Sequence, residues 1–441
     1  MKLARTLSRL IIGITFILSG FLKAIDPTGG ALKIDEYLKA FHMGFLDFIS
    51  MPAGVLLSAA EFIIGVCILK GIKMRLFSKI TLGFVSFFTL LTLYSALFNP
   101  VQDCGCFGEA FHLTNWETFF KNLILLACAL LIFWQRDKFR PIATPKWTYI
   151  YLGFYTAFIL GVSFYALRYL PQIDFGIFKP DTILAANDAA RQEHEYETVF
   201  TYSKEGVEKQ FTLENLPDST WTFVSADTKL LSISSDSGSG TELILKNKAG
   251  IYVTAEVLGD EGPMVMLSVY NCKKIERALA KDISLAKDIK DLYEAAVANG
   301  ARFYILSGNS LEDTEKIFPC EEELVPDSLS VRASDLNRVP VLYTDYKSAL
   351  SLNRSNGGLT YINDGTIIKK WSRYEYPSEI AVIVGHDSEI IAAQETTKEL
   401  LFVEITLVAI LLLILINRLI SRRLYTKWLQ KKKASQEESA D

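Results

Sequence analysis

Residues 80–134 read ITLGFVSFFTLLTLYSALFNPVQDCGCFGEAFHLTNWETFFKNLILLACALLIFW. Two apolar runs, 80–98 and 116–134, enclose a short polar turn that holds Cys104 and Cys106. Each run approaches the roughly 20 residues that an α-helix needs to cross a bilayer. The stretch therefore predicts two membrane-spanning helices joined by a turn that carries two cysteines.

Four further apolar segments have a similar length, and 50% of the 441 residues are hydrophobic. These segments are residues 7–22, 52–69, 147–170 and 400–420. The first is similar to a cleaved signal peptide, but no small-x-small cleavage site follows it, and Lys23 and Asp26 directly flank its end. We therefore expect a retained anchor and a multi-pass α-helical bundle in a lipid bilayer.

Basic residues lie in the connections on one side of the six predicted crossings. Short cytoplasmic connections collect Lys and Arg, so this asymmetry predicts the orientation. We expect both termini in the cytoplasm, and the connections 23–51 and 99–115 outside the inner membrane of a bacterium, together with a periplasmic soluble domain. The basic residues are Lys2, Arg5, Arg9, Lys70, Lys73, Arg75, Lys79, Arg136, Lys138, Arg140, Lys146, Arg418, Arg422, Arg423, Lys427 and Lys431.

The net charge of −4 hides an uneven distribution. Residues 172–400 carry 37 Asp and Glu against 23 Lys and Arg, whereas the rest of the chain carries 13 acids and 23 bases. An acidic soluble segment beside a basic, apolar remainder is typical of a membrane protein with a water-soluble domain. Nucleic-acid binding would need a basic soluble face, so the charge pattern excludes that function class.

The apolar segments and the change in composition predict five regions. They are a four-helix membrane bundle (1–138), a fifth transmembrane helix (139–171), a β-rich extracytoplasmic segment (172–260), an α/β domain (261–398), and a sixth transmembrane helix with a basic cytoplasmic tail (399–441).

The soluble segment shows β and α patterns in a defined order. In its β-rich part, YETVFTY and KQFTL alternate in polarity and predict a hairpin. The α/β part begins with a predicted strand at 263–270, a helix at about 273–299 and a second strand, RFYIL. The dipeptide Asp364-Gly365 predicts a later hairpin turn. This order favours an α/β thioredoxin-like layer arrangement.

The two cysteines of the turn are the leading candidates for chemistry. Extended residues two apart lie about 7 Å from Cα to Cα, at the upper edge of disulfide geometry. Gly105 permits a sharper turn. A disulfide between Cys104 and Cys106 would be strained, and strained, exposed disulfides exchange readily. The start of the following helix could lower the pKa of a thiol here, an effect that the charge of Asp103 opposes, and Asp103 is a further site candidate.

Two other interpretations of the cysteine turn stay open. A structural disulfide would hold the loop and do no redox work. A metal site has less support, because zinc sites usually need four ligands and only His112 lies nearby.

Two weaker candidates lie elsewhere. Glu61 interrupts the second apolar segment, and an acid inside a membrane is by default a site candidate, although a structural hydrogen bond between helices also explains it. Cys272 follows a predicted strand and opens a helix, a position where thiols become reactive. It has no C-x-x-C partner, and a structural disulfide with Cys320 is the competing explanation.

Residues 7–135 resemble the DoxX/MauE group of redox-associated bacterial membrane proteins. The resemblance rests on LIIGITFILSGFLKAIDPTGG, AEFIIGVCILKG and NPVQDCGCFGEAFHLTNWETFFKN. The soluble part resembles the degenerate thioredoxin-like domain fused to such bundles, on EYETVFTYSKEGVEKQFTL, DSTWTFV and RSNGGLTYINDGTIIKKW. The resemblance implies extracytoplasmic thiol or electron transfer, with Cys104 and Cys106 as the redox pair.

The soluble part departs from redox-active thioredoxins at two positions. Cys272 lacks a resolving cysteine, and Gly357 precedes the GLTYIN strand where a cis-proline is expected. These departures indicate a domain that binds a partner or supports the bundle.

We predict an inner-membrane protein that takes part in thiol–disulfide exchange with an extracytoplasmic thiol or disulfide protein. Electrons would pass to or from that partner or a quinone, for which no binding motif is evident. The alternative is a non-enzymatic membrane-anchored assembly or folding factor. Its thioredoxin-like domain would bind a client, and its cysteine pair would be structural.

Overall fold

The structure of this protein is a computed structural model. It describes residues 2–101, 105–109, 113–139, 144–184, 196–204, 207–211, 221–230, 243–318, 339–377 and 388–437. Asp103, Cys104, His112 and Cys320 lie outside these ranges.

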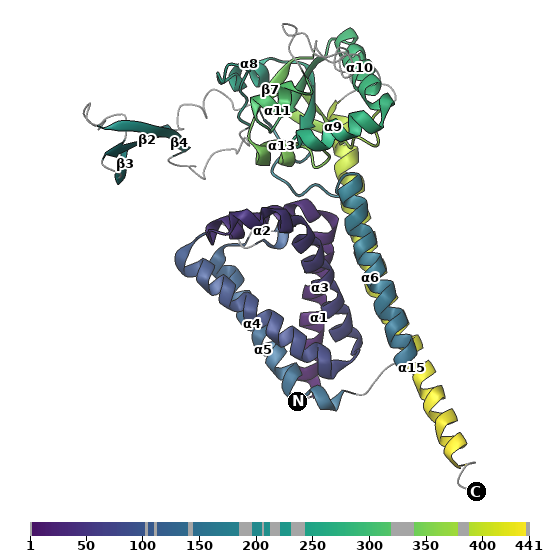
Figure 1. Cartoon of the computed structure of the whole chain (residues 1–441). Helices are drawn as coiled ribbons and strands as arrows, with labels where there is room; N and C mark the ends of the chain where they lie inside the picture. The colour runs from purple at the N-terminus through teal and green to yellow at the C-terminus, as the bar shows by residue number, and fades with distance from the viewer. Residues whose placement is uncertain are drawn as a thin grey trace.

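Within the described residues, five helices are long and apolar enough to cross a membrane (Figure 1). They are α1 (Lys2–Ile25), α3 (Ser50–Lys70), α4 (Met74–Phe98), α5 (Asn115–Trp134) and α6 (Pro145–Arg168). Five of the six predicted spans are therefore confirmed as apolar helices of sufficient length. The sixth segment, 400–420, lies within α15 (Ser388–Glu437), whose Ile410 and Ile414 belong to one buried cluster with residues of α6.

Helices α1 and α3 pack closely because glycines lie at their contact. A Cβ atom added to Gly20 of α1 would come within 2.5 Å of the backbone nitrogen of Phe62 on α3. A Cβ atom added to Gly65 of α3 would come within 2.7 Å of the backbone nitrogen of Ile17 on α1. Small residues that allow such close approach are typical of membrane helix interfaces.

The connections at one end of the bundle contain short helices and a strand. After α1, α2 (Pro27–Ala40) and the 3-10 helix η1 (Gly44–Ile49) lead into α3, and α2 runs across the end of the bundle (Figure 1). Strand β1 (Cys106–Glu109) follows α4. Helix α5 begins with a capping box, in which Thr114 and Glu117 each accept a hydrogen bond from the other's backbone N–H.

A five-stranded mixed sheet forms the domain beyond this end of the bundle. Its strands are β5 (Pro263–Val269), β6 (Arg302–Ser307), β7 (Val341–Tyr343), β8 (Gly358–Asn363) and β9 (Thr366–Trp371). Their order is β7-β6-β5-β8-β9, with β5, β6 and β7 parallel and β8 and β9 antiparallel. The predicted β-α-β unit and the hairpin at Asp364-Gly365 are both confirmed.

Short and medium-length helices cover the sheet. They are α8 (Thr254–Gly259), α9 (Cys272–Lys281), α10 (Ile283–Ala298), α11 (Leu311–Glu315) and α13 (Tyr346–Leu352). The single helix predicted at 273–299 is wrong, because Asp282 takes an extended conformation (φ −116°, ψ 100°) and divides it into α9 and α10. Apolar side chains pack on both faces of β5, with Val265 and Leu267 in one cluster and Met264 and Met266 in the other.

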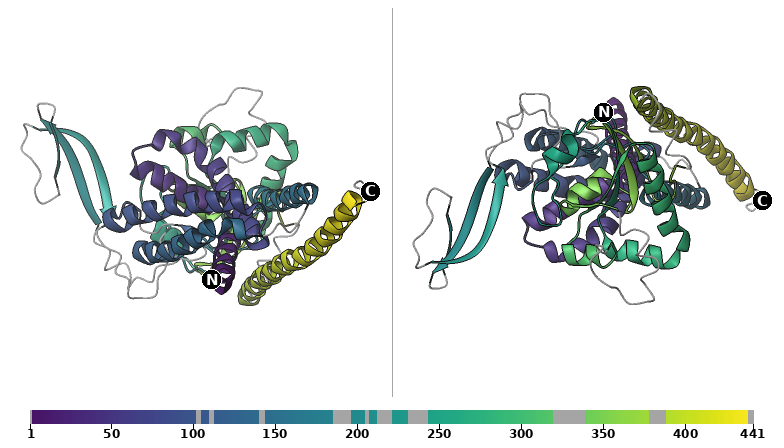
Figure 2. Two further views of the ribbon diagram at one scale, coloured as in Figure 1. Left: turned by 90° about the horizontal axis from the view of Figure 1, so that it is seen from below. Right: turned by 90° about the horizontal axis from the view of Figure 1, so that it is seen from above.

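The β-rich segment contains a second sheet. It consists of β2 (Tyr196–Lys204), β3 (Val207–Phe211) and β4 (Thr222–Leu230), in the order β3-β2-β4. Both pairings are antiparallel, which confirms the predicted β2–β3 hairpin. In both views of Figure 2 this sheet lies to one side of the rest of the chain.

The ends of the described chain lie away from the five-stranded sheet. Figure 1 places both the N-terminus and the C-terminus at the end of the membrane helices opposite that sheet. The termini and the sheet therefore lie at opposite ends of the membrane helices, and the side of the membrane on which each lies stays a prediction.

The α1–α3 contact gives a first prediction. Gly20→Leu should lower the free energy of unfolding of the detergent-solubilised full chain by about 1–3 kcal/mol or more, because the added side chain meets the backbone of α3. Gly153→Leu is the matched control, since a Cβ on this glycine of α6 meets no atom within 4 Å. Equal denaturation midpoints for the two variants would contradict the close packing.

Candidate functional site

Cys106 opens β1 beside the C-terminal part of α1 and beside α2. Gly105 precedes it with a positive φ of 61°, and an added Cβ would come within 2.7 Å of Cγ of Lys33. Glycine is therefore required at this position for both its conformation and its space. The other members of the predicted turn site, Asp103 and Cys104, lie outside the described residues.

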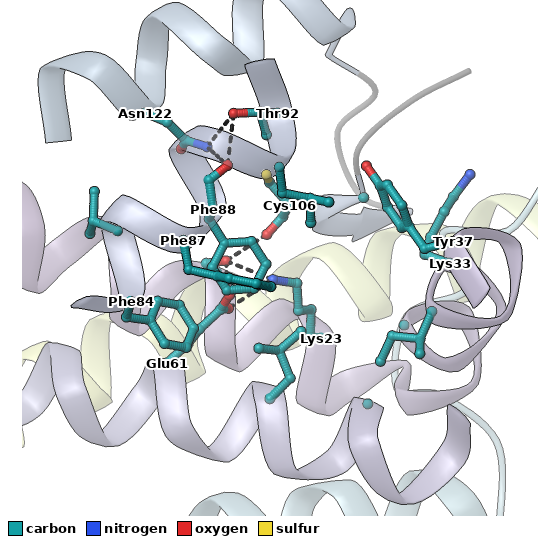
Figure 3. A pocket seen from close by; sticks show the side chains of 18 of the residues that line it. Lys23, Lys33, Tyr37, Glu61, Phe84, Phe87, Phe88, Thr92, Cys106 and Asn122 are labelled. Carbon is teal, nitrogen blue, oxygen red and sulfur yellow. Dashed lines mark hydrogen bonds and ion pairs between the residues drawn. The ribbon is translucent and has the colours of Figure 1, made fainter. Parts of the chain in front are cut away.

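A buried ion pair lies directly beneath Cys106. The Nζ atom of Lys23 on α1 lies 2.7 and 2.8 Å from the two carboxylate oxygens of Glu61 on α3, and both side chains are less than 10% exposed. The Oγ atom of Ser19 lies 2.8 Å from Oε2 of Glu61 and 2.6 Å from the backbone oxygen of Cys106. Figure 3 shows Lys23, Glu61 and Cys106 in this arrangement.

This network places Glu61 next to the cysteine turn. Glu61 was predicted as a site candidate from its position in an apolar helix, and the structure connects it to Cys106 through one hydroxyl group. Glu61 of α3 also bonds to Ser19 and Lys23 of α1, which is the hydrogen bonding between helices that the structural interpretation predicts. Both features belong to the same residue, and its chemical role stays a prediction.

A cavity of about 450 Å³ opens beside the ion pair. Cys106, Lys23 and Glu61 contribute to its wall, and most of the remaining wall is apolar (Figure 3). The other lining residues come from α1 to α5, and among them are Phe16, Tyr37, Leu57, Phe84, Phe87, Phe88, Leu91, Thr92, Asn122 and Leu125.

A second buried charge cluster joins the membrane bundle to the sheet domain. Arg354, which precedes β8, places Nη2 3.0 Å from Oδ2 of Asp26 and 2.5 Å from Oε2 of Glu109. Only 2% of the Arg354 side chain is exposed. Asp26 also caps α2 by accepting a hydrogen bond from the backbone N–H of Gly29.

Burial and the presence of two carboxylates beside one guanidinium shift the pKa values of this cluster. Burial lowers the pKa of Arg354, but Asp26 and Glu109 outweigh it and raise that pKa above its ordinary value. Burial raises the pKa of Glu109, because Arg354 compensates only in part and Asp26 adds a like charge. Two carboxylates therefore share one guanidinium, and Glu109 binds a proton more readily than an exposed glutamate.

The loop that carries Arg354 lies against the helix start that carries Cys272. The side-chain oxygen of Asn356 accepts hydrogen bonds of 3.0 Å from the backbone N–H groups of Tyr270 and Asn271. Gly357 has a φ of 86°, and no peptide bond of the described residues is cis.

Cys272 occupies the predicted position but lies in an unfavourable environment for a reactive thiol. It begins α9 and is 3% exposed, with its Sγ 3.9 Å from Oγ1 of Thr314. Burial raises the pKa of this thiol, although the neighbouring hydroxyl groups oppose the shift. The expected reactivity at the helix start is therefore opposed by desolvation. Its predicted disulfide partner, Cys320, lies outside the described residues.

The sequence identified some of these residues and missed others. Lys23 was read only as a charge flanking the first apolar segment, whereas α1 continues to Ile25 and buries it. The four-residue spacing of Ser19 and Lys23, on one face of a helix, was the available signal. Arg354, Asp26 and Glu109 come from distant parts of the chain, and no local pattern joins them. Among the described residues, no group of three His, Cys, Asp or Glu side chains is placed to hold a metal ion.

Comparison with known proteins identifies the N-terminal part. Residues 1–135 match the family described as methylamine utilisation protein MauE, which confirms the MauE resemblance for the membrane bundle. Residues 196–232 match a domain of unknown function, DUF8463. Protein TlpB of Flavobacterium psychrophilum is 27% identical over 135 residues, which are 30% of this chain and 36% of that protein. No solved structure matches the chain.

The Arg354 cluster gives a second prediction. Arg354→Ala should lower the free energy of unfolding by about 3–5 kcal/mol, because two buried carboxylates lose their counter-charge. Chemical denaturation of the detergent-solubilised full chain measures the effect. Lys347→Ala is the matched control at the same interface, since its 3.4 Å pair with Glu36 is partly exposed and should contribute less than about 1 kcal/mol. Equal losses in the two variants would show that Arg354 does not hold the domains together.

Proposed function

We propose that this protein is a membrane thiol oxidoreductase that exchanges disulfides through Cys104 and Cys106. The observation that carries the proposal is the fixed backbone of Cys106, whose carbonyl oxygen is bonded to Ser19 above the Lys23–Glu61 pair. A buried ion pair is expensive, and intramembrane charges usually mark functional sites. The MauE match of residues 1–135 supports a redox-associated membrane domain.

The proposed exchange conserves electrons at each step. The thiolate of one cysteine attacks a partner's disulfide, which releases one partner thiol and forms a mixed disulfide. The second cysteine then attacks the mixed disulfide and releases the other partner thiol. The partner gains two electrons, and the Cys104–Cys106 pair is oxidised to a disulfide. The reverse sequence would oxidise a partner dithiol.

Ser19, Lys23 and Glu61 act as positioning residues in this mechanism. Ser19 donates to the backbone oxygen of Cys106, and Lys23 and Glu61 bond to Ser19 and to each other, so the three residues together fix where β1 begins. A small disulfide ring formed across Gly105 would need such support, because its geometry lies at the edge of the permitted range.

In this proposal the sheet domain controls access to the turn. Its thioredoxin-like character is supported by the parallel β5–β6 pair and the antiparallel β8–β9 hairpin. Its buried Cys272 and its Gly357 argue against disulfide exchange within the domain itself. The domain instead contacts the strand that carries Cys106, through Arg354 and Glu109. We place it in the periplasm, with both termini in the cytoplasm, as the charge asymmetry of the connections predicts.

A non-enzymatic assembly factor is the second candidate. The same burial of Cys272 favours it, since a sheet domain whose described cysteine is inaccessible is suited to binding a client. In that function the cysteine turn is structural and does not form mixed disulfides.

Trapping of mixed disulfides separates the two functions. In Cys106→Ala, Cys104 has no resolving partner, so adducts with the natural substrate should accumulate several-fold over wild type. Non-reducing electrophoresis of alkylated membranes detects them as bands that a reductant removes. The Cys104→Ala/Cys106→Ala variant should give none of these bands, and Cys272→Ala should leave the wild-type pattern. Identical patterns in Cys106→Ala and in the double variant would support the assembly factor.

A further inference from the structure

We propose that a buried charge network makes the contact between the membrane bundle and the sheet domain sensitive to pH. The contact holds while Glu109 is protonated and is released when Glu109 ionises. The inference rests on the proposed function, because it names what regulates access to the cysteine turn. The members of the network come from five segments of the chain, and they are Asp26, Glu109, Asp174, Arg354 and Lys370.

Short ion pairs connect the network across the contact. Nη2 of Arg354, in the loop before β8, lies 3.0 Å from Oδ2 of Asp26 at the start of α2 and 2.5 Å from Oε2 of Glu109 at the end of β1. Nζ of Lys370 on β9 lies 2.5 Å from Oδ2 of Asp174, in the connection that follows α6. All five side chains are at most 14% exposed.

The two groups of ion pairs adjoin at Gly176. A Cβ atom added there would come within 2.9 Å of Oδ1 of Asp174, 3.2 Å of Nη2 of Arg354 and 3.3 Å of Oε2 of Glu109. The backbone N–H of Gly176 also donates a 2.9 Å hydrogen bond to Oδ1 of Asp174. Asp174 therefore lies beside the Arg354–Glu109 pair, and the charges of the two groups act on one another.

The network carries one more negative than positive charge when every group is ionised. Three carboxylates face one guanidinium and one ammonium group. Lys33 of α2 also acts on Glu109, but it pairs with Glu36 at 3.2 Å and so adds no net charge. A buried charge without compensation is costly, and one proton removes the excess. The network is therefore balanced when one of its carboxylates is protonated.

Glu109 is the carboxylate that takes this proton. Burial raises its pKa, and the like charges of Asp26 and Asp174 add to a shift that Arg354 compensates only in part. Burial would also raise the pKa of Asp174, but Lys370 and Arg354 outweigh it and hold that pKa below its ordinary value. Asp174 therefore stays ionised while Glu109 titrates.

The direction of the pH response follows from the position of Glu109 in the two states. In the released state Glu109 is exposed to water, where a glutamate has a pKa of about 4.3. Its pKa is higher in the docked state, so the docked state binds the proton more tightly. The contact is therefore fully stabilised below the pKa of the released state. This stabilisation is lost as the pH rises through the pKa of the docked state.

A small cavity gives protons access to the network. It has a volume of about 50 Å³, and Asp174 and Lys370 contribute to its wall together with Leu170 and Pro180. One water molecule needs roughly 10–15 Å³ of such space. A water molecule next to Asp174 can therefore pass a proton to the network while the contact is still closed.

Release of the contact frees the end of β1 that is opposite Cys106. Glu109 ends this strand, which begins at Cys106. The hydrogen bond between Ser19 and the backbone oxygen of Cys106 is separate from the network. Loss of the Arg354 contact therefore leaves the start of β1 in place while the sheet domain moves away from it. A partner protein gains room to approach the cysteine turn at higher pH.

Distance measurements on the full chain in phosphatidylcholine nanodiscs test the proposal. Every native cysteine is replaced by serine, and Phe45→Cys on η1 and Val297→Cys on α10 carry spin labels, since these side chains are 75% and 51% exposed. Pulsed electron paramagnetic resonance gives the docked and released populations from about pH 4.3 to about pH 9. The ratio of released to docked molecules should rise about 10-fold per pH unit between the two pKa values of Glu109.

Two variants separate Glu109 from the rest of the contact. Glu109→Gln keeps the size of the side chain and cannot ionise, so the protein should stay docked throughout the pH series. Lys347→Ala is the matched control, because it removes the partly exposed pair with Glu36 from the same contact and leaves the network intact. It should raise the released fraction at each pH and keep the pH response.

The outcomes separate this proposal from the proposed function. The same pH response in wild type and Glu109→Gln would overturn the network, as would release on acidification. A released fraction that is independent of pH in both wild type and Lys347→Ala would overturn it too. The labelled protein lacks its native cysteines, so these results do not depend on thiol exchange. Docking that responds to pH through Glu109, while Cys106→Ala traps no partner, would support the network and refute the proposed function.

Discussion

The ion pair between Lys23 and Glu61 is the interaction on which the arrangement of the site depends. Two charges inside a membrane bundle carry a large desolvation penalty, and loss of either partner leaves the other uncompensated, at a cost of about 3–5 kcal/mol. The pair lies where α1 meets α3, and the glycines of that contact bring the two helices close enough for a 2.7 Å separation. Ser19 extends the pair to the backbone of Cys106. The helix contact, the charges and the turn therefore support one another.

Strand β1 is held at both of its ends. Cys106 bonds to Ser19 in the bundle, and Glu109, three residues later, pairs with Arg354 of the sheet domain. The sheet domain makes this contact through the loop before β8 that carries Arg354 and Gly357. The same loop bonds to the start of the helix that carries the buried Cys272. The strand that begins at Cys106 is therefore joined both to the bundle and to the sheet domain.

The sequence predicted the features that depend on local pattern. Apolar length predicted five of the membrane helices, and the alternating runs predicted the β2–β3 hairpin. The break at Asp282 was missed, because a polar residue in an amphipathic helix looks the same whether the helix continues or stops. Glu61 stood out because an acid is rare in an apolar helix, but Lys23 did not, since it lies near a helix end where a lysine is ordinary. The Arg354 cluster combines residues 26, 109 and 354, and such pairing depends on how the two domains dock.

The positioning of Cys106 is tested most directly by the rate at which a maleimide alkylates it. The protein for this measurement is embedded in nanodiscs, and every other cysteine is replaced by serine. Lys23→Met and Glu61→Gln should each raise the rate at least 10-fold, because the unpaired partner no longer holds Ser19 against the carbonyl of Cys106. The Lys23→Met/Glu61→Met variant, which removes both charges, should be less destabilised than the single Lys23→Met variant while the fast alkylation remains. Unchanged rates in folded single variants would show that the ion pair does not position the cysteine turn, and would contradict the account.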